Sequence, residues 1–233
     1  MFRSIISKSA AFINLAILVG IGLVLSGCGM LHKADAHAMP AVPFDAMVIR
    51  HTVADFAKWK PAFDADAPAR DAAGLHLIGV GRGILNPNEV DLPFVADSVE
   101  KAKAFGGDPR LKDVMKKAGV TSEPNVKFLR VIRMSEVGKQ GALGNYVTLA
   151  HKVKDFDAWL KVFDREGAAV RAKDGLIDAV LARGIDDPNL VFLVFKINSV
   201  EQVKAAMANP ERQKLMQEGN VVGEPEIYFG NDK

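Results

Sequence analysis

The apolar positions of this chain follow a pattern that occurs twice. Residues 51–64 read HTVADFAKWKPAFD, and residues 151–164 read HKVKDFDAWLKVFD. His, Val, Asp, Phe, Trp, Phe and Asp stand at the same places in both segments, which together contain both tryptophans of the chain. Matching residues at so long a period indicate two copies of one structural module.

Each segment begins at the end of a predicted strand. Residues 47–53 alternate between apolar and polar side chains, as do residues 147–153. A period of two is typical of a strand with one buried face. His51 and His151 fall on the apolar face, so both imidazoles are expected to face the core.

A helix is predicted to follow each strand. Asp55 and Asp155 are suitable N-cap residues, because a short carboxylate accepts the free amides of a first helical turn. Aromatic residues then recur at i, i+3 and i+7, as one face of a helix requires. They are Phe56, Trp59 and Phe63 in the first copy and Phe156, Trp159 and Phe163 in the second. Pro61 predicts a kink in the first helix or a later start.

Two more strands follow in each copy, now at an offset of 101 residues. Apolar runs at 75–82 and 176–183 lead through Asn-Pro or Asp-Pro turns to the runs 90–95 and 190–195. Pro93 lies inside one of these runs and favours an edge strand, because proline has no amide hydrogen to donate.

Each copy then continues with two helices and a last strand. Ser98 and Ser199 are predicted to cap the first of these helices, and Pro109 and Pro210 to open the second. The last strands are expected to end at Phe128 and Phe229.

The element order gives an α+β fold class. Strand, helix, strand, strand, helix, short helix, strand is a βαββαβ, ferredoxin-like unit of about ninety residues. The expected domains are a signal peptide at 1–27, a lipidated cysteine with a flexible tether at 28–43, a first repeat at 44–134, a linker at 135–144 and a second repeat at 145–233.

The amino terminus predicts export. Arg3 and Lys8 precede an apolar run at 10–25, which is typical of a secretory signal peptide. The following Leu-Ser-Gly-Cys resembles the lipobox of bacterial lipoproteins, which implies a lipid on Cys28. An uncleaved membrane anchor is the alternative, although the run is barely long enough to span a bilayer.

Lipidation predicts a membrane-anchored protein that faces the periplasm. Gly29 after the cysteine resembles the pattern of outer-membrane lipoproteins, if the host has two membranes. Cys28 is the only cysteine, so the exported part forms no internal disulfide.

The charge balance argues against nucleic acid as a partner. Removing residues 1–27 takes away Arg3 and Lys8 and no acid, which leaves 28 basic and 28 acidic residues. A neutral chain has no general attraction for a phosphate backbone. Dinucleotide fingerprints, phosphate loops, HExxH, CxxC and nucleophile elbows do not occur in the sequence.

With this element order and the H-x-V-x-D-F-x-x-W-x-x-x-F-D block, each copy resembles the dimeric α+β barrel superfamily. The resemblance is to its stress-responsive and antibiotic-biosynthesis-monooxygenase-like (ABM-like) modules, and it covers residues 44–133 and 145–230. It implies that the two repeats press their sheets together as an intramolecular barrel. The superfamily includes monooxygenases, isomerases and haem-handling proteins, so it does not settle the function.

The candidate ligand pocket combines the histidines with their aromatic neighbours and two arginines that end strands. Its residues are His51, Trp59, Phe63 and Arg82 in one copy and His151, Trp159, Phe163 and Arg183 in the other. In a cavity, either histidine is suited to act as a general base or to bind haem iron or another metal. The simpler interpretation is a buried histidine whose tautomer is held by one backbone hydrogen bond.

The arginines also have two interpretations. Arg82 and Arg183 are placed to hold a carboxylate or phenolate at the mouth of a cavity, or else lie in solvent at a strand end. Arg70 and Arg171 also correspond, and are interpreted as polar faces of their helices.

We therefore expect a membrane-anchored protein that binds a small apolar or aromatic ligand or has a structural role. The alternative is a cofactor-free monooxygenase or isomerase with His51 or His151 as base, and haem binding is third. The sequence predicts no cofactor and no metal site, and leaves association into a homo-oligomer open.

Overall fold

A computed structural model describes residues 39–232 of the chain. They belong to one compact unit, residues 36–233. The signal peptide, Cys28 and the tether as far as residue 38 lie outside the described residues.

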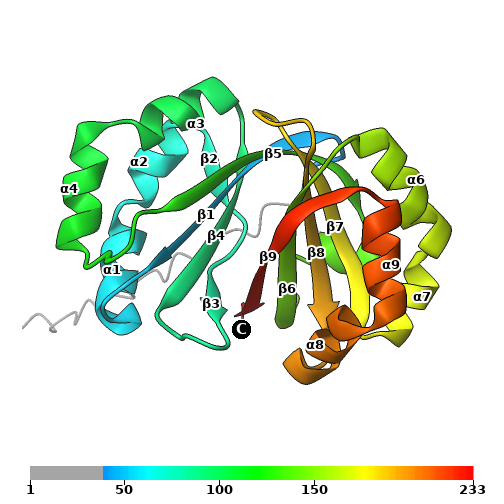
Figure 1. The fold of residues 1–233 in the computed structure, drawn as a ribbon. Helices are drawn as coiled ribbons and strands as arrows, with labels where there is room; N and C mark the ends of the chain where they lie inside the picture. Colours follow the sequence, from blue (N-terminus) through cyan, green and yellow to red (C-terminus); the bar gives the residue numbers. More distant parts are fainter. Residues whose placement is uncertain (1–38, 233) are drawn as a thin grey trace, which may run out of the picture. The chain divides into compact units, whose positions relative to one another are not determined.

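The described residues form nine strands and nine helices, with the helices on the outside of a curved sheet (Figure 1). The strands are β1 Phe44–Thr52, β2 Leu75–Leu77, β3 Gly81–Gly83, β4 Glu89–Ala96, β5 Asn125–Met134, β6 Asn145–Val153, β7 Leu176–Gly184, β8 Leu190–Ile197 and β9 Val221–Asn231. The helices are α1 Phe56–Ala65, α2 Ala67–Ala72, α3 Val99–Gly106, α4 Pro109–Lys117, α5 Glu136–Lys139, α6 Phe156–Glu166, α7 Ala168–Lys173, α8 Val200–Ala208 and α9 Pro210–Glu218.

Eight of the strands close into a barrel within one chain. The order is β1-β5-β7-β8-β6-β9-β3-β4, and β4 pairs back onto β1. The short strand β2 also pairs with β4. The expected α+β barrel is therefore confirmed.

Two seams join the first half of the barrel, β1–β5, to the second half, β6–β9. At one seam β5 pairs with β7, and at the other β3 pairs with β9. The predicted ends of the last strands are wrong, because β5 continues to Met134 and β9 to Asn231. The extra residues are the ones that pair across the seams.

The predicted helix caps are confirmed. The side chains of Asp55, Asp155, Ser98 and Ser199 each accept a hydrogen bond from an amide in the first turn of the helix that follows. The later start predicted from Pro61 is wrong, since α1 begins at Phe56 and runs through the proline.

Pro93 does not lie on an edge strand, which corrects the sequence prediction. Its strand, β4, pairs with β1 on one side and with β2 and β3 on the other. The gap between β2 and β3, residues 78–80, lies opposite Pro93. Because proline lacks an amide hydrogen, the ladder loses a bond there and the neighbouring strand is interrupted. In the second half, β7 is continuous.

Closure gives each strand an outer face and an inner face. On β1, Met47 and Ile49 pack outward in a core that includes Trp59 of α1. Ala46 and Val48 pack inward, in a separate core with residues of β5, β6, β7 and β8. In Figure 1, α1–α4 cover the first half of the barrel and α6–α9 the second. Among the described residues, no helix has the length and apolarity needed to cross a membrane.

Candidate functional site

The structure brings each histidine against the aromatic stripe of its helix. The ring of His51 meets Trp59 edge-on with 5.8 Å between centroids, and Trp59 stacks on Phe63 at 4.7 Å. The second half repeats this arrangement, with 5.7 Å from His151 to Trp159 and 5.0 Å from Trp159 to Phe163. The strand register and the N-cap together position these groups.

Each imidazole lines a cavity between the sheet and the helices. The cavities beside His51 and His151 have volumes of about 70 Å³ each. Aliphatic and aromatic side chains make up most of both walls. Such a volume holds a few water molecules but is below the usual size of a ligand pocket, about 300–1,000 Å³.

His51 is buried and His151 partly buried, and neither makes the expected backbone hydrogen bond within the described residues. Among the described residues, neither ring nitrogen of His51 has a hydrogen-bond partner, and neither does Nε2 of His151. His51 is only 5% exposed. Burial lowers the pKa of each histidine to about 4, so both rings are neutral at physiological pH.

Arg82 and Arg183 do not line these cavities. Their Nε atoms donate hydrogen bonds to the carbonyl oxygens of Pro87 and Pro188. Each guanidinium lies over the phenylalanine that opens the first helix, at 4.1 Å from the Phe56 ring centroid in the first half and 4.5 Å in the second. The structure therefore places them at the loop that follows each hairpin strand.

Arg70 and Arg171 line the cavities instead. The prediction that they form polar helix faces is wrong, because they are 6% and 3% exposed. Each donates a 2.7 Å hydrogen bond to the carbonyl oxygen of Phe63 or Phe163 and lies over the same phenylalanine ring. Each arginine stands in the short helix after that of the phenylalanine, seven or eight residues further along the chain, and helical periodicity does not continue across the break between the two helices. The sequence pattern therefore contained no signal of this contact.

In the second half, a larger hollow of about 350 Å³ adjoins the cavity of His151. The two share the side chains of Phe163, Arg171, Leu193 and Phe195. The charged groups that line this hollow pair with one another. Arg171 binds Asp178 through two hydrogen bonds of 2.8 and 2.7 Å, and Arg133 binds Asp164. Paired charges and apolar walls suit a neutral molecule.

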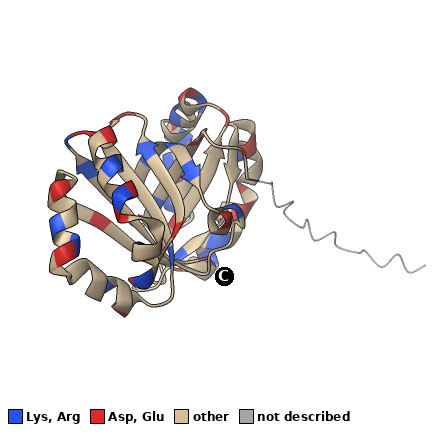
Figure 2. Ribbon diagram, turned by 90° about the vertical axis from the view of Figure 1, so that its right-hand side faces the viewer, with Lys and Arg blue, Asp and Glu red and all other residues tan. Residues whose placement is uncertain are grey.

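Charged residues elsewhere are mixed in sign. Figure 2 shows Lys and Arg interspersed with Asp and Glu over the helices. This agrees with the equal numbers of basic and acidic residues in residues 28–233.

The described residues do not fit a haem group at either histidine. Both imidazoles line cavities of about 70 Å³, and His151 does not line the larger hollow. A tryptophan ring also meets each imidazole edge-on. A macrocycle needs far more room than either cavity provides. In the described part of the chain, no group of three or more His, Cys, Asp or Glu residues is arranged to hold a metal ion.

The lowered histidine pKa values predict how stability depends on pH. A ring that resists protonation in the folded state is protonated more readily once unfolded, so stability is lost as the pH falls from about 6.5 to about 4. We expect the free energy of unfolding to drop by about 2 kcal/mol per histidine between pH 7.5 and pH 5. Urea unfolding at both pH values measures this.

In the same experiment, His51→Leu and His151→Leu should each reduce the drop in unfolding free energy between the two pH values by the contribution of one histidine. Ring-proton NMR provides an independent check. Two rings that titrate near 6.5 in the folded protein would contradict the burial described above.

Comparisons with known proteins place the fold. No family model and no curated protein sequence matches the chain. Among solved structures, an anthrone oxidase-like protein is 15% identical with a TM-score of 0.55, over 81% of this chain and 91% of that one. A candidate chlorite dismutase is 13% identical with a TM-score of 0.53, over 81% and 94%.

A third similar structure comes from Listeria monocytogenes 4b F2365. It is a ferredoxin-fold protein related to antibiotic biosynthesis monooxygenases, with 11% identity and a TM-score of 0.47, over 82% of this chain and 95% of that one. At these identities the likeness is one of fold. The chain has an α+β barrel fold similar to that of the anthrone oxidase-like protein and of the candidate chlorite dismutase.

Proposed function

We propose that this protein is a lipid-anchored protein of the bacterial envelope that binds a small, neutral, apolar or aromatic molecule. The anchor is the lipid on Cys28. The binding site is the hollow beside the cavity of His151, between the sheet and helices α6 and α7.

We also propose that the barrel consists of two copies of one module. The register supports this, because His51 pairs with Val90 and Met47 with Phe94 in the first half. In the second half, His151 pairs with Val191 and Val147 with Phe195, which are the positions expected from the sequence offset.

The observation that carries the binding function is the hollow of about 350 Å³ in the second half. This volume lies within the range of small-molecule sites, whereas the cavities beside the histidines lie below it. Leu193 and Phe195 form an apolar floor, and the lining arginines are already paired. A neutral aromatic ligand buries apolar surface there without breaking an ion pair.

The alternative is a cofactor-free monooxygenase or isomerase with His51 or His151 as general base. The unpartnered ring nitrogens favour it, since such an atom is free to accept a proton. The pKa of about 4 opposes it, because a general base works best with a pKa near the working pH. Binding is therefore the function that this geometry supports better.

A neutral naphthalene dye such as N-phenyl-1-naphthylamine tests the binding site. We expect its fluorescence to rise on adding residues 36–233, which contain every described strand and helix and form one compact unit. Leu193→Phe narrows the hollow and should weaken binding at least tenfold, measured by fluorescence titration.

The matched control is Leu92→Phe, at the equivalent position in the first half. Leu92 lines the cavity of His51 and does not line the hollow where the dye is expected to bind. This variant should bind the dye like the parent protein. Equal weakening by both substitutions, or none by Leu193→Phe in a folded protein, would exclude the proposed site.

The lipid anchor is tested in the full-length chain. We expect metabolic labelling with a fatty acid and recovery in the membrane fraction, with a mass that shows loss of residues 1–27. Cys28→Ser should lose the label and retain the signal segment. A Cys28→Ser protein that is still labelled, or a parent protein that keeps residues 1–27, would favour the uncleaved anchor instead.

A further inference from the structure

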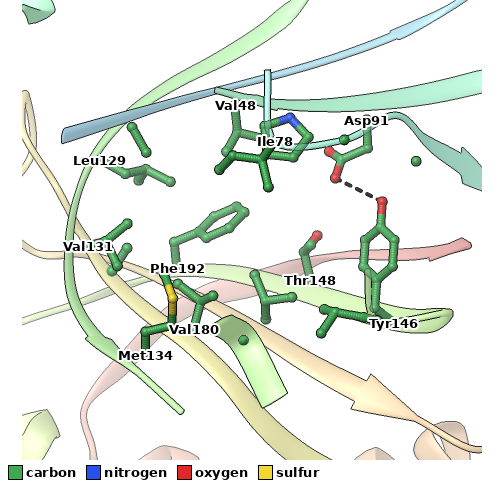
Figure 3. A pocket seen from close by; sticks show the side chains of 18 of the residues that line it. Val48, Ile78, Asp91, Leu129, Val131, Met134, Tyr146, Thr148, Val180 and Phe192 are labelled. Atoms are coloured by element: carbon green, nitrogen blue, oxygen red, sulfur yellow. Dashed lines mark hydrogen bonds between the residues drawn. The ribbon is translucent and has the colours of Figure 1, made fainter. Parts of the chain in front are cut away.

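The interior of the barrel contains a cavity distinct from those beneath the helices. Its volume is about 110 Å³. Most of its wall is apolar, with Val48, Leu129, Val131, Val180, Phe192 and Val194 among the lining side chains. Asp91, Tyr146 and Thr148 provide polar groups on one side, as Figure 3 shows.

These polar groups belong to a buried hydrogen-bonded cluster. Arg50 donates to Oδ1 of Asp91 from Nε and Nη2, at 3.2 and 3.1 Å, and to Oγ1 of Thr148 at 2.8 Å. The hydroxyl of Tyr146 donates to Oδ2 of Asp91 at 3.1 Å. All four side chains are at most 9% exposed. The guanidinium of Arg50 also lies 4.0 Å from the ring centroid of Tyr228.

The cluster leaves hydrogen-bonding capacity directed at the cavity. Oδ1 of Asp91 accepts two hydrogen bonds, but Oδ2 accepts one and keeps a second lone pair. Thr148 accepts from Arg50, and its own hydroxyl hydrogen has no acceptor among the bonds of the described residues. One acceptor and one donor therefore stand together at the polar side.

The fold does not require this cluster, because the other half of the barrel lacks it. Arg50 pairs with Asp91 in the β1–β4 register, and the equivalent pair in β6–β8 is Ala150 with Phe192. At the positions equivalent to Tyr146 and Thr148, the first half has alanine and valine. The same architecture is thus packed with apolar residues on one side, and such packing is often as stable as a buried ion pair.

Two glycines beside Tyr146 leave the space that its ring occupies. A Cβ at Gly81 would lie 1.8 Å from the Tyr146 hydroxyl oxygen, and one at Gly230 would lie 2.4 Å from its Cζ atom. The equivalent positions in the other half are Ala182 and Leu129. Two glycine backbones therefore hold the tyrosine hydroxyl in place beside Asp91, as a preorganised site requires.

We propose that the barrel interior is a second binding site, for a small neutral molecule with an apolar ring or branched chain and one hydroxyl group. The hydroxyl donates to Oδ2 of Asp91 and accepts from Thr148, while the apolar part contacts Phe192 and the valines. A cavity of about 150 Å³ holds benzene, so the smaller cavity of about 110 Å³ suits a ligand of roughly four or five heavy atoms, such as cyclobutanol.

Cyclobutanol and cyclopentane, which match in number of heavy atoms, are the probes for this site, titrated into residues 36–233 and followed by methyl NMR. We expect both to shift the methyl signals of Val48, Val131, Val180 and Val194, with affinities in the millimolar range or tighter for so few atoms. Cyclobutanol should bind about tenfold more tightly than cyclopentane, because it completes the hydrogen bonds of Asp91 and Thr148.

Two substitutions separate recognition from folding. Thr148→Val removes the donor and should reduce the preference for cyclobutanol about tenfold while leaving cyclopentane binding unchanged. Thr148→Ser keeps the hydroxyl and should keep the preference. If Thr148→Val does not fold, the ratio of cyclobutanol to cyclopentane affinity in the parent protein still tests whether the site recognises a hydroxyl.

Equal affinity for cyclobutanol and cyclopentane, or shifts confined to methyls outside the barrel, would overturn the proposal. Leu193→Phe distinguishes this site from the outer one. It should weaken dye binding in the hollow at least tenfold but leave cyclobutanol binding at the barrel valines unchanged, so that either site can fail without the other.

Discussion

Closure of the sheet is the constraint on which the rest of this structure depends. A four-stranded sheet has two open edges, whose amide and carbonyl groups need partners. Here those edges meet across the two seams. The amide of Ile84 donates to the carbonyl oxygen of Phe229 at 2.8 Å, and the amide of Ile185 to that of Phe128 at 2.9 Å. One chain therefore satisfies its own edges.

Closure also creates two environments with different chemistry. The outer faces lie under helices and carry the same His, Trp and Phe arrangement in both halves. We therefore interpret this arrangement as part of the packing between sheet and helices. The inner faces differ between the halves. One side has Arg50, Asp91, Tyr146 and Thr148, and the equivalent positions on the other side are apolar. The site that we propose inside the barrel lies where the halves differ.

Short-range features of the fold were predictable from sequence, because they depend on neighbours along the chain. Helix caps such as Asp55 and the stripe of Phe56 and Trp59 are examples. The buried cluster was not predictable. Its hydrogen-bonded pairs join residues 41 to 98 positions apart, and Arg50 stood on what looked like the polar face of a strand. That face is buried only because the second half of the chain closes over it. Lipidation of Cys28 remains a prediction.

The most direct test of this account is amide hydrogen exchange in the dilute, monomeric protein. The account predicts strong protection of the Ile84 and Ile185 amides, comparable with that of amides in the central strands β4 and β8, because both donate across the seams. If these two amides exchange as fast as exposed loops, or become protected only when chains associate, the barrel does not close within one chain.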